Sequence, residues 1–297
     1  MAGWRFEAIG TGWEIETDVP LADHIRAAVT AEIERFDRAW SRFRDDSDVS
    51  RLGRAGGRLS SPDARPMLDV YRELDAATAG AVNPLVADSL AALGYDAAYS
   101  LQTGDPRPAP ASWTERLAWS DDAVEAVAPA LLDVGAVGKG RLVDRVMAAL
   151  ADVPGDVVVD AGGDIRARGG TVRIALEHPY DARKAIGVVE LHDGALCASA
   201  VNRRAWGDGL HHVLDARTGR PVRTWAATWA LAPDAMTADA VATALFFDGG
   251  PELAARWGAE WVRMTTDGRV QRSPGCPAEL FIAAAAGAAG PGGDLTP

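Results

Sequence analysis

The spacing of apolar residues changes at Asp156, and this change limits the folds that the chain can adopt. Before Asp156, apolar residues recur at helical spacing in two long stretches, 21–40 and 62–79. After it, short apolar segments follow one another as strands do, at 156–161, 171–177, 186–191, 196–199, 212–214 and 226–231. This grouping predicts an α+β fold, in which mixed, mainly antiparallel sheets pack against helices.

The remaining segments fit the same fold class. Further strands are expected at 4–18, 116–120, 123–128, 259–264 and 268–271, further helices at 138–150 and 234–247, and a polar turn at 44–48. A single domain over residues 1–282 is expected, with a surface loop or weak lobe boundary near the proline-rich segment 104–111. Residues 283–297 are mostly alanine, glycine and proline, which predicts a disordered tail.

Charge and composition exclude several classes of function. A net charge of -12 argues against binding to nucleic acid, which needs a basic face. The two cysteines do not form a disulfide framework, and no apolar run reaches the roughly 18 residues that a transmembrane helix needs. The first residues lack the pattern of a secretory signal, so a cytoplasmic protein is expected. An anionic ligand would need a local cation, and Mg²⁺ is the usual one.

The segment from Leu131 to Gly140 is the first with chemical content. Glycines at 135, 138 and 140 surround Lys139, one of two lysines in the chain, where a helix is expected to begin. Backbone N–H groups at a helix start, together with a lysine, suit phosphate. The glycine spacing matches neither a P-loop nor a dinucleotide fingerprint, and an ordinary turn into a helix remains the alternative.

Three later segments are each ambiguous alone. Gly162, Gly163 and Asp164 are typical of a hairpin turn. His212 and Asp215 could act as a base with its orienting carboxylate or bind metal, or they could simply end a strand.

Asp239 and Thr243, one helical turn apart, present two hard oxygen atoms on one face. Such oxygens suit Mg²⁺, although small polar residues in an alanine-rich helix are the simpler interpretation.

Taken in order, these segments resemble the ApbE family of FAD:protein FMN transferases (flavin transferases). The similarity runs from about Trp40 to Gly249. The matching pieces are 41–48, 81–85, 133–140 with Asp144, 162–164, 197–199 with Arg204, 212–219 and 239–243. The resemblance implies an ApbE-like, T-fold-like layered architecture and transfer of FMN from FAD to a threonine or serine of an acceptor protein, with release of AMP. The expected acceptor is a redox or respiratory subunit with a motif similar to Asp-Gly-x-Ser/Thr-Gly/Ala-Thr.

The resemblance also implies roles for individual residues. A metal ion, either Mg²⁺ or Mn²⁺, would be held by the carbonyl of Ala136 and by the side chains of Asp239 and Thr243. His212, oriented by Asp215, would lie beside the pyrophosphate and accept a proton. The residues expected to contact FAD are Phe43, Ala81, Val82, Asn83, Asp133, Lys139, Gly162, Gly163, Ser199 and Arg204.

The chain departs from the family pattern at several positions. Gly53 replaces the usual asparagine, Asn83 an aspartate, and Ala216 a proline, while Ala198 and Ala200 flank Ser199 in place of threonine and glycine. Two other functions therefore stay open: a metal-dependent FAD pyrophosphatase that releases FMN and AMP, and a protein that binds FAD without consuming it.

Overall fold

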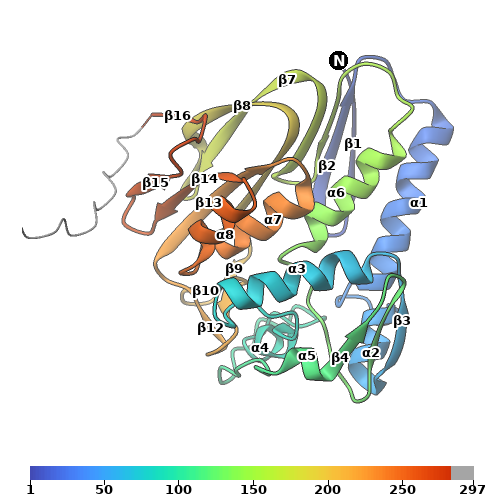
Figure 1. The fold of residues 1–297 in the computed structure, drawn as a ribbon, viewed down its shortest axis with the longest axis vertical. Coiled ribbons are helices and arrows are strands. Elements are labelled where there is room, and N and C mark those ends of the chain that lie inside the picture. Colours follow the sequence, from blue (N-terminus) through green and yellow to red (C-terminus); the bar gives the residue numbers. More distant parts are fainter. Residues whose placement is uncertain (282–297) are drawn as a thin grey trace, which may run out of the picture.

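A large sheet forms one half of the structure, a computed structural model that describes residues 1–281 (Figure 1). The tail expected at 283–297 lies outside these residues. The strand order is β1-β2-β6-β7-β8-β13-β14-β15, every pairing along it is antiparallel, and β16 pairs with β8. The strands are β1 (Ala2–Ala8), β2 (Thr11–Thr17), β6 (Val157–Asp160), β7 (Asp164–His178), β8 (Asp181–Ala200), β13 (Trp225–Ala232), β14 (Glu260–Thr265), β15 (Val270–Arg272) and β16 (Glu279–Leu280).

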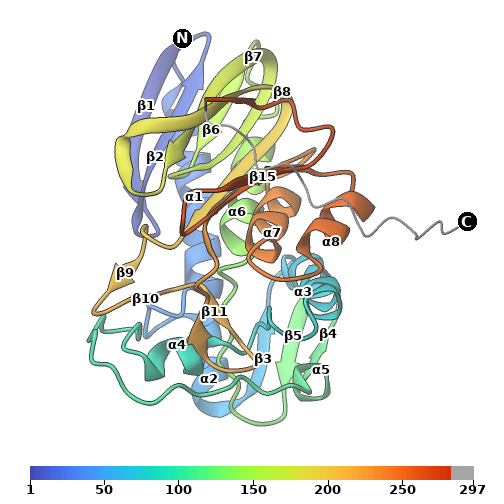
Figure 2. The same ribbon diagram turned by 90° about the vertical axis from the view of Figure 1, so that its left-hand side faces the viewer.

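Helices α1 (Asp23–Trp40), α6 (Gly138–Ala149) and α7 (Ala235–Ala244) cover one face of this sheet (Figures 1 and 2). Alternate strand residues face these helices: Ile15 of β2 and Val159 of β6 are buried in the same core as the helix residues. Their neighbours Glu14 and Val158 point to the opposite face. One face is therefore packed against helices, while the part of the sheet formed by β7, β8, β13 and β14 also contributes to a second hydrophobic cluster.

The other half of the structure is mainly helical (Figure 2). A small sheet of order β3-β5-β4 lies at its end. The elements are α2 (Asp48–Ala55), β3 (Gly57–Ser60), α3 (Ala64–Ala77), α4 (Ala87–Ala92), α5 (Trp113–Arg116), β4 (Leu117–Trp119) and β5 (Ala123–Ala126), with the two-residue strands β9 (Ala205–Trp206), β10 (Leu210–His211), β11 (Leu214–Asp215) and β12 (Arg220–Pro221). Helix α8 (Gly250–Arg256) lies beside α7 and contacts both α3 and β14 (Figure 2). These elements confirm the expected α+β class.

Several sequence expectations need correction. The segments at 171–177, 186–191 and 196–199 belong to just two long strands, β7 and β8, whose pairing is interrupted by register shifts. His212 and Val213 lie between β10 and β11 and not in a strand. The polar turn at 44–48 leads directly into a helix, because the Ser47 hydroxyl accepts the N–H of Ser50 and caps α2. None of the helices within residues 1–281 is long and apolar enough to cross a membrane.

A network of ion pairs fixes the start of α6 against α1. Arg145 of α6 and Arg35 both reach Glu32 of α1, with N···O distances of 2.6 and 2.7 Å. Arg141 and Arg35 also bind the buried carboxylate of Asp63, each at 2.9 Å. Charges this well paired, with one fully buried partner, hold a defined geometry. The network thus holds the helix that begins at the glycine-lysine turn.

Candidate functional site

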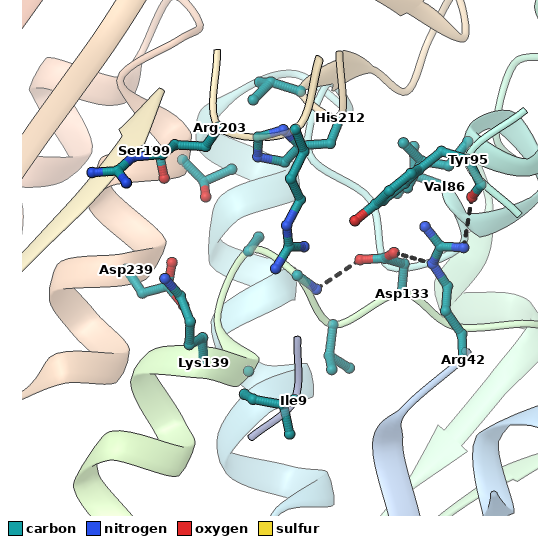
Figure 3. A pocket seen from close by; sticks show the side chains of 18 of the residues that line it. Ile9, Arg42, Val86, Tyr95, Asp133, Lys139, Ser199, Arg203, His212 and Asp239 are labelled. Carbon is teal, nitrogen blue, oxygen red and sulfur yellow. Dashed lines mark hydrogen bonds and ion pairs between the residues drawn. The ribbon is translucent and has the colours of Figure 1, made fainter. Parts of the chain in front are cut away.

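A cavity of about 430 Å³ opens between the main sheet and the helical half (Figure 3). Its wall is assembled from segments far apart in the chain, including the β1–β2 hairpin tip, the end of α1, the start of α6, and the middle and end of α7. Most of the expected site residues line it: Phe43, Ala81, Val82, Asn83, Asp133, Ala136, Lys139, Gly162, Ser199, Arg204, His212, Asp239 and Thr243. The fold therefore brings together residues that the sequence separates by as much as 200 positions.

The glycine-lysine turn is held rigid from behind by Tyr71 of α3. The buried Tyr71 hydroxyl donates to the carbonyl of Asp133 at 2.8 Å and accepts the N–H of Ala136 at 3.3 Å. Asp133 also closes the turn on itself, since its Oδ1 accepts the N–H of Gly135 at 2.7 Å. The turn before α6 is thus shaped before any ligand arrives.

Arg42 engages the other oxygen of Asp133 across the cavity wall (Figure 3). Its Nε donates to Oδ2 at 2.5 Å, and its Nη1 donates to the carbonyl of Tyr95 at 2.8 Å. Burial opposes ionisation of Asp133, but the Arg42 guanidinium outweighs it and lowers the pKa of the carboxyl group. Arg42 also lies over the rings of Phe43 and Tyr95, 4.1 and 4.9 Å from their centroids. Asp133, Arg42 and their aromatic neighbours form one wall of the cavity.

A buried charge cluster occupies the opposite wall, where Figure 3 shows Lys139 and Asp239. Lys139 Nζ lies 3.2 Å from Asp164 Oδ2 and donates to the carbonyl of Ala161. Burial opposes the charged form of Lys139, but Asp164 and Asp239 prevail and raise its pKa. Asp239 is 3% exposed, and its pKa is raised well above the usual range by burial and by Asp164. Two carboxylates thus share one ammonium group.

This excess of negative charge fits a bound cation. Within residues 1–281, no three His, Cys, Asp or Glu side chains converge in the manner of an all-protein metal site. The set expected here differs from such a site, since it combines one carboxylate, one hydroxyl and one carbonyl oxygen, from Asp239, Thr243 and Ala136, and all three residues line the cavity. Hard oxygen donors with room for phosphate oxygens suit Mg²⁺. The residues present therefore fit the metal that the resemblance implies.

Gly140 allows α6 and α7 to approach each other closely. Its N–H donates to Asp239 Oδ2 at 3.0 Å, and a Cβ atom at this position would lie 2.8 Å from Asp239 Cβ and closer still to the Ala235 carbonyl. We expect Gly140→Ala to destabilise the fold by about 1–3 kcal/mol through overpacking and to displace Asp239. Thermal unfolding should show a loss of several degrees in the melting temperature.

Gly3→Ala serves as the control for this substitution. Gly3 lies in β1, and the nearest atom to an added Cβ is Glu14 Oε1 at 3.4 Å, an ordinary contact with a flexible side chain. A melting temperature equal to that of the wild type in both variants would contradict the packing argument.

His212 is neutral at physiological pH. Its pKa is lowered to about 3, chiefly by burial and also by the neighbouring positive charge of Arg204. The backbone N–H of His212 donates to the Arg204 carbonyl at 3.3 Å, while the ring nitrogen Nδ1 is buried with no hydrogen-bond partner in the described part of the chain. The imidazole therefore offers an unused nitrogen at the cavity wall.

Two expected site residues take other places. The Asp215 carboxylate binds Arg217 at 2.7 Å and accepts the N–H of the same residue, so it does not form the expected hydrogen bond with His212. Gly163 lies just outside the cavity, where it lines a neighbouring groove and donates to Asp160 Oδ1. Asp215 therefore shapes the 215–219 turn and does not orient the histidine.

The departures from the family pattern have local structural reasons. Asn83 donates through Nδ2 to the carbonyl of Pro110 at 2.9 Å, which an aspartate could not do, and thereby ties the 104–111 segment to the cavity wall. Ala216 donates its N–H to the carbonyl of Ala81, a bond that a proline could not form. Gly53 faces Leu131 inside the helical half, where a Cβ would come within 2.7 Å of the leucine side chain.

Sequence reasoning missed several residues of the cavity. Ile9 and Thr11, at the tip of the β1–β2 hairpin, line it, as do Arg42, Tyr71, Tyr95 and Asp164. Ile9 has a positive φ of 47°, which is strained for a β-branched residue, and such strain often marks a functional position. Arg42 and Asp164 fall inside two of the matching sequence segments, so those segments could have pointed to them.

The fold and the cavity define an α+β protein whose cleft is suited to a phosphate-bearing ligand and a divalent cation. The ApbE family model matches residues 9–262, and the chain therefore belongs to the ApbE family.

Several known proteins are similar to this chain. A FAD:protein FMN transferase of Rhodobacter capsulatus is 28% identical over 93% of this chain, which spans only 57% of that relative's length. One from Klebsiella pneumoniae is 27% identical over 84% of this chain and 78% of its own. The flavin transferase ApbE from Vibrio cholerae, a solved structure, superposes with a TM-score of 0.75 at 22% identity, covering 92% of this chain and 97% of its own. An ApbE protein from Thermotoga maritima gives 0.73 with the same identity and coverage. These structures confirm the fold.

Proposed function

We propose that this protein is a Mg²⁺-dependent FAD:protein FMN transferase, which moves FMN from FAD to a threonine or serine hydroxyl of an acceptor protein. The observation that carries the proposal is the cavity wall formed by α6 and α7, where Lys139, Asp239 and Thr243 meet the glycine turn. Similar proteins that bear this name support it. The proposed acceptor is a redox or respiratory subunit.

The cavity provides for both parts of the dinucleotide. Its volume of about 430 Å³ lies in the range of small-molecule and cofactor sites. Lys139 and Arg204 supply positive charge for the pyrophosphate, and the aromatic wall around Phe43 and Tyr95 supplies flat apolar surface for a ring system. Asp133 and Asn83 are already fixed by protein contacts and hold the wall in shape.

Ala136, Asp239 and Thr243 would hold the metal ion. When bound, Mg²⁺ would neutralise the pyrophosphate oxygens and stabilise the charge that develops as the bond breaks. Lys139 keeps Asp164 neutralised at 3.2 Å, which leaves Asp239 as the carboxylate available to the ion. Gly140 fixes Asp239 by its N–H bond.

In the proposed reaction the acceptor oxygen attacks the FMN-side phosphorus, a phosphoester bond forms, the P–O–P bond breaks and AMP leaves. The hydroxyl proton passes to the neutral imidazole of His212, whose Nδ1 has no hydrogen-bond partner in the described residues. An anionic pyrophosphate beside Arg204 offsets the positive charge that lowers the pKa of His212, and this makes the imidazole a stronger base in the complex.

The decisive experiment follows the fate of the phosphate. The purified protein is incubated with FAD, Mg²⁺ and a peptide carrying the acceptor motif Asp-Gly-x-Ser/Thr-Gly/Ala-Thr, with EDTA as the control. Flavin fluorescence of the peptide after denaturation and chromatography of the nucleotides are read together. We expect a fluorescent peptide and an equal amount of AMP, both abolished by EDTA.

The competing functions give different products. Free FMN with AMP and no labelled peptide would establish a pyrophosphatase, in which water takes the place of the hydroxyl. Intact FAD throughout, with binding detected, would leave a flavin-binding protein without transferase activity.

A further inference from the structure

A second groove, of about 480 Å³, adjoins the cavity on the sheet face opposite α6 and α7. Gly162, Ser199 and Arg203 line both spaces, as do Ala198 and Ala200. Ser199 and Arg203 are both visible at the edge of the cavity in Figure 3. The two spaces therefore meet where β8 ends and where the β6–β7 hairpin turns.

The floor of this groove is apolar and partly exposed. Val158, Ile165 and Val172 come from β6 and β7, and they pack beside a core cluster that includes the buried Trp229 of β13. Contiguous apolar surface with a polar rim is typical of an interaction site. A groove floored by strands suits an extended polypeptide, whose side chains alternate in the same way.

The rim is acidic along β2. Glu14 and Glu16 line the groove together with Asp160 of the adjacent strand β6, and Glu14 is paired with one arginine, Arg5, at 2.7 Å. Three carboxylates thus have one paired guanidinium group here, because Arg173, which also lines the groove, pairs with Glu279 at 3.7 Å. At the other end Glu177 is neutralised by Arg203 at 3.1 Å. The excess negative charge is therefore concentrated on β2 and β6.

The positions of the acidic residues along β2 determine how far their carboxylates lie from the cavity. Thr11 lines the cavity, and Glu14 and Glu16 follow it on the same strand. At about 3.4 Å per residue, these carboxylates lie roughly 10 and 17 Å from the cavity edge. An extended peptide running along the groove would place there the residues about three to six positions from one held in the cavity.

We propose that this acidic groove binds the acceptor polypeptide as an extended segment that carries lysine or arginine about three to six residues from the modified hydroxyl. The inference rests on the proposed function, because a protein acceptor needs a path into the cavity and water does not. Continuity with the cavity and complementary charge identify the segment next to the modified residue as the occupant.

The test reverses the charge of the peptide and, separately, the charge of the groove. Acceptor peptides with the motif used above carry either two lysines or two glutamates three to six positions from the modified threonine, on either side in separate peptides. For the wild type we expect about a tenfold higher kcat/KM for the best lysine peptide than for its glutamate counterpart, since each surface pair contributes modestly. Glu14→Lys with Glu16→Lys should reverse the preference.

Two further variants make the result specific. Glu14→Gln with Glu16→Gln should level the preference without introducing positive charge, and so covers the case in which the charge reversal fails to fold. Glu73→Lys with Glu115→Lys makes the same change in net charge on exposed positions of α3 and α5, away from the groove, and should keep the wild-type preference.

The outcomes separate this inference from the proposed function. Equal use of both peptides by the wild type, or an unchanged preference in both groove variants, would overturn the groove assignment while the transferase stands. If the wild type labels no peptide and still releases AMP from FAD, the transferase proposal fails and the groove assignment falls with it.

Discussion

Asp239→Asn should lower metal-dependent FAD turnover by about a thousandfold, roughly 4 kcal/mol of lost stabilisation in the transition state. Asparagine keeps the size of the side chain and an oxygen for the Gly140 N–H, but it removes the charge that would hold the cation. Apparent Mg²⁺ affinity should fall as well. Initial rates of AMP release across a series of Mg²⁺ concentrations measure both effects.

The same substitution should leave the metal-free fold as stable as the wild type, or more so. Burial and Asp164 raise the pKa of Asp239, which means that the folded protein disfavours its charged form. Activity and stability should therefore move in different directions. Asp75→Asn, at a carboxylate on α3 whose pKa is also raised by burial but which lies outside the cavity, is the matched control and should leave turnover unchanged. Normal turnover in Asp239→Asn would rule out the metal assignment.

Lys139→Met should destabilise the fold by about 3 kcal/mol and weaken FAD binding about tenfold to a hundredfold. The loss of stability arises because Asp164, whose side chain is 1% exposed, would lose its partner at 3.2 Å, and burial, which already raises the pKa of this carboxyl group, would leave it either to take up a proton or to stay charged and unpaired in the interior. The loss of affinity arises because the ammonium group would no longer face the pyrophosphate. Urea unfolding and quenching of flavin fluorescence measure the two effects.

The double variant Lys139→Met with Asp164→Asn separates these effects. Removing both charges should restore most of the stability, since no unpaired carboxylate remains, while FAD binding stays weak. If the double variant unfolds at the same urea concentration as Lys139→Met alone, the buried pair is not the source of the loss.

Local sequence patterns predicted the parts of this fold that depend on local order. The apolar spacing of 21–40 and 62–79 corresponds to α1 and α3, and Asp239 and Thr243 lie on one helix as their spacing indicated. The Gly162-Gly163 turn joins two antiparallel strands, as the glycines suggested. Helices α4 and α5, with six and four residues, were missed because they are too short for a periodic signal.

The cavity walls are held by contacts between residues far apart in the sequence, which no local sequence pattern can predict. Arg42 meets Asp133 across 91 positions of sequence, and Gly140 meets Asp239 across 99. Most residues that the family resemblance named line the cavity, but the resemblance paired His212 with Asp215, whose carboxylate is bound by Arg217. Within the 215–219 turn, Asp215 forms a short-range salt bridge with Arg217 in place of a contact to the histidine. The hairpin tip at Ile9 and Thr11 carried no motif at all.

The position of the β1–β2 hairpin in the chain affects how the protein folds during its synthesis on the ribosome. The hairpin leaves the exit tunnel before its pairing partner β6, which is synthesised roughly 140 residues later, a delay on the order of ten seconds at cellular elongation rates. Isolated two-stranded hairpins are marginally stable, so the apolar side chains of Trp4, Phe6 and Trp13 stay exposed in the nascent chain until the rest of their core is synthesised. The cavity between the sheet and the helical half therefore forms late in synthesis, and this interval is when the chain most needs protection from aggregation.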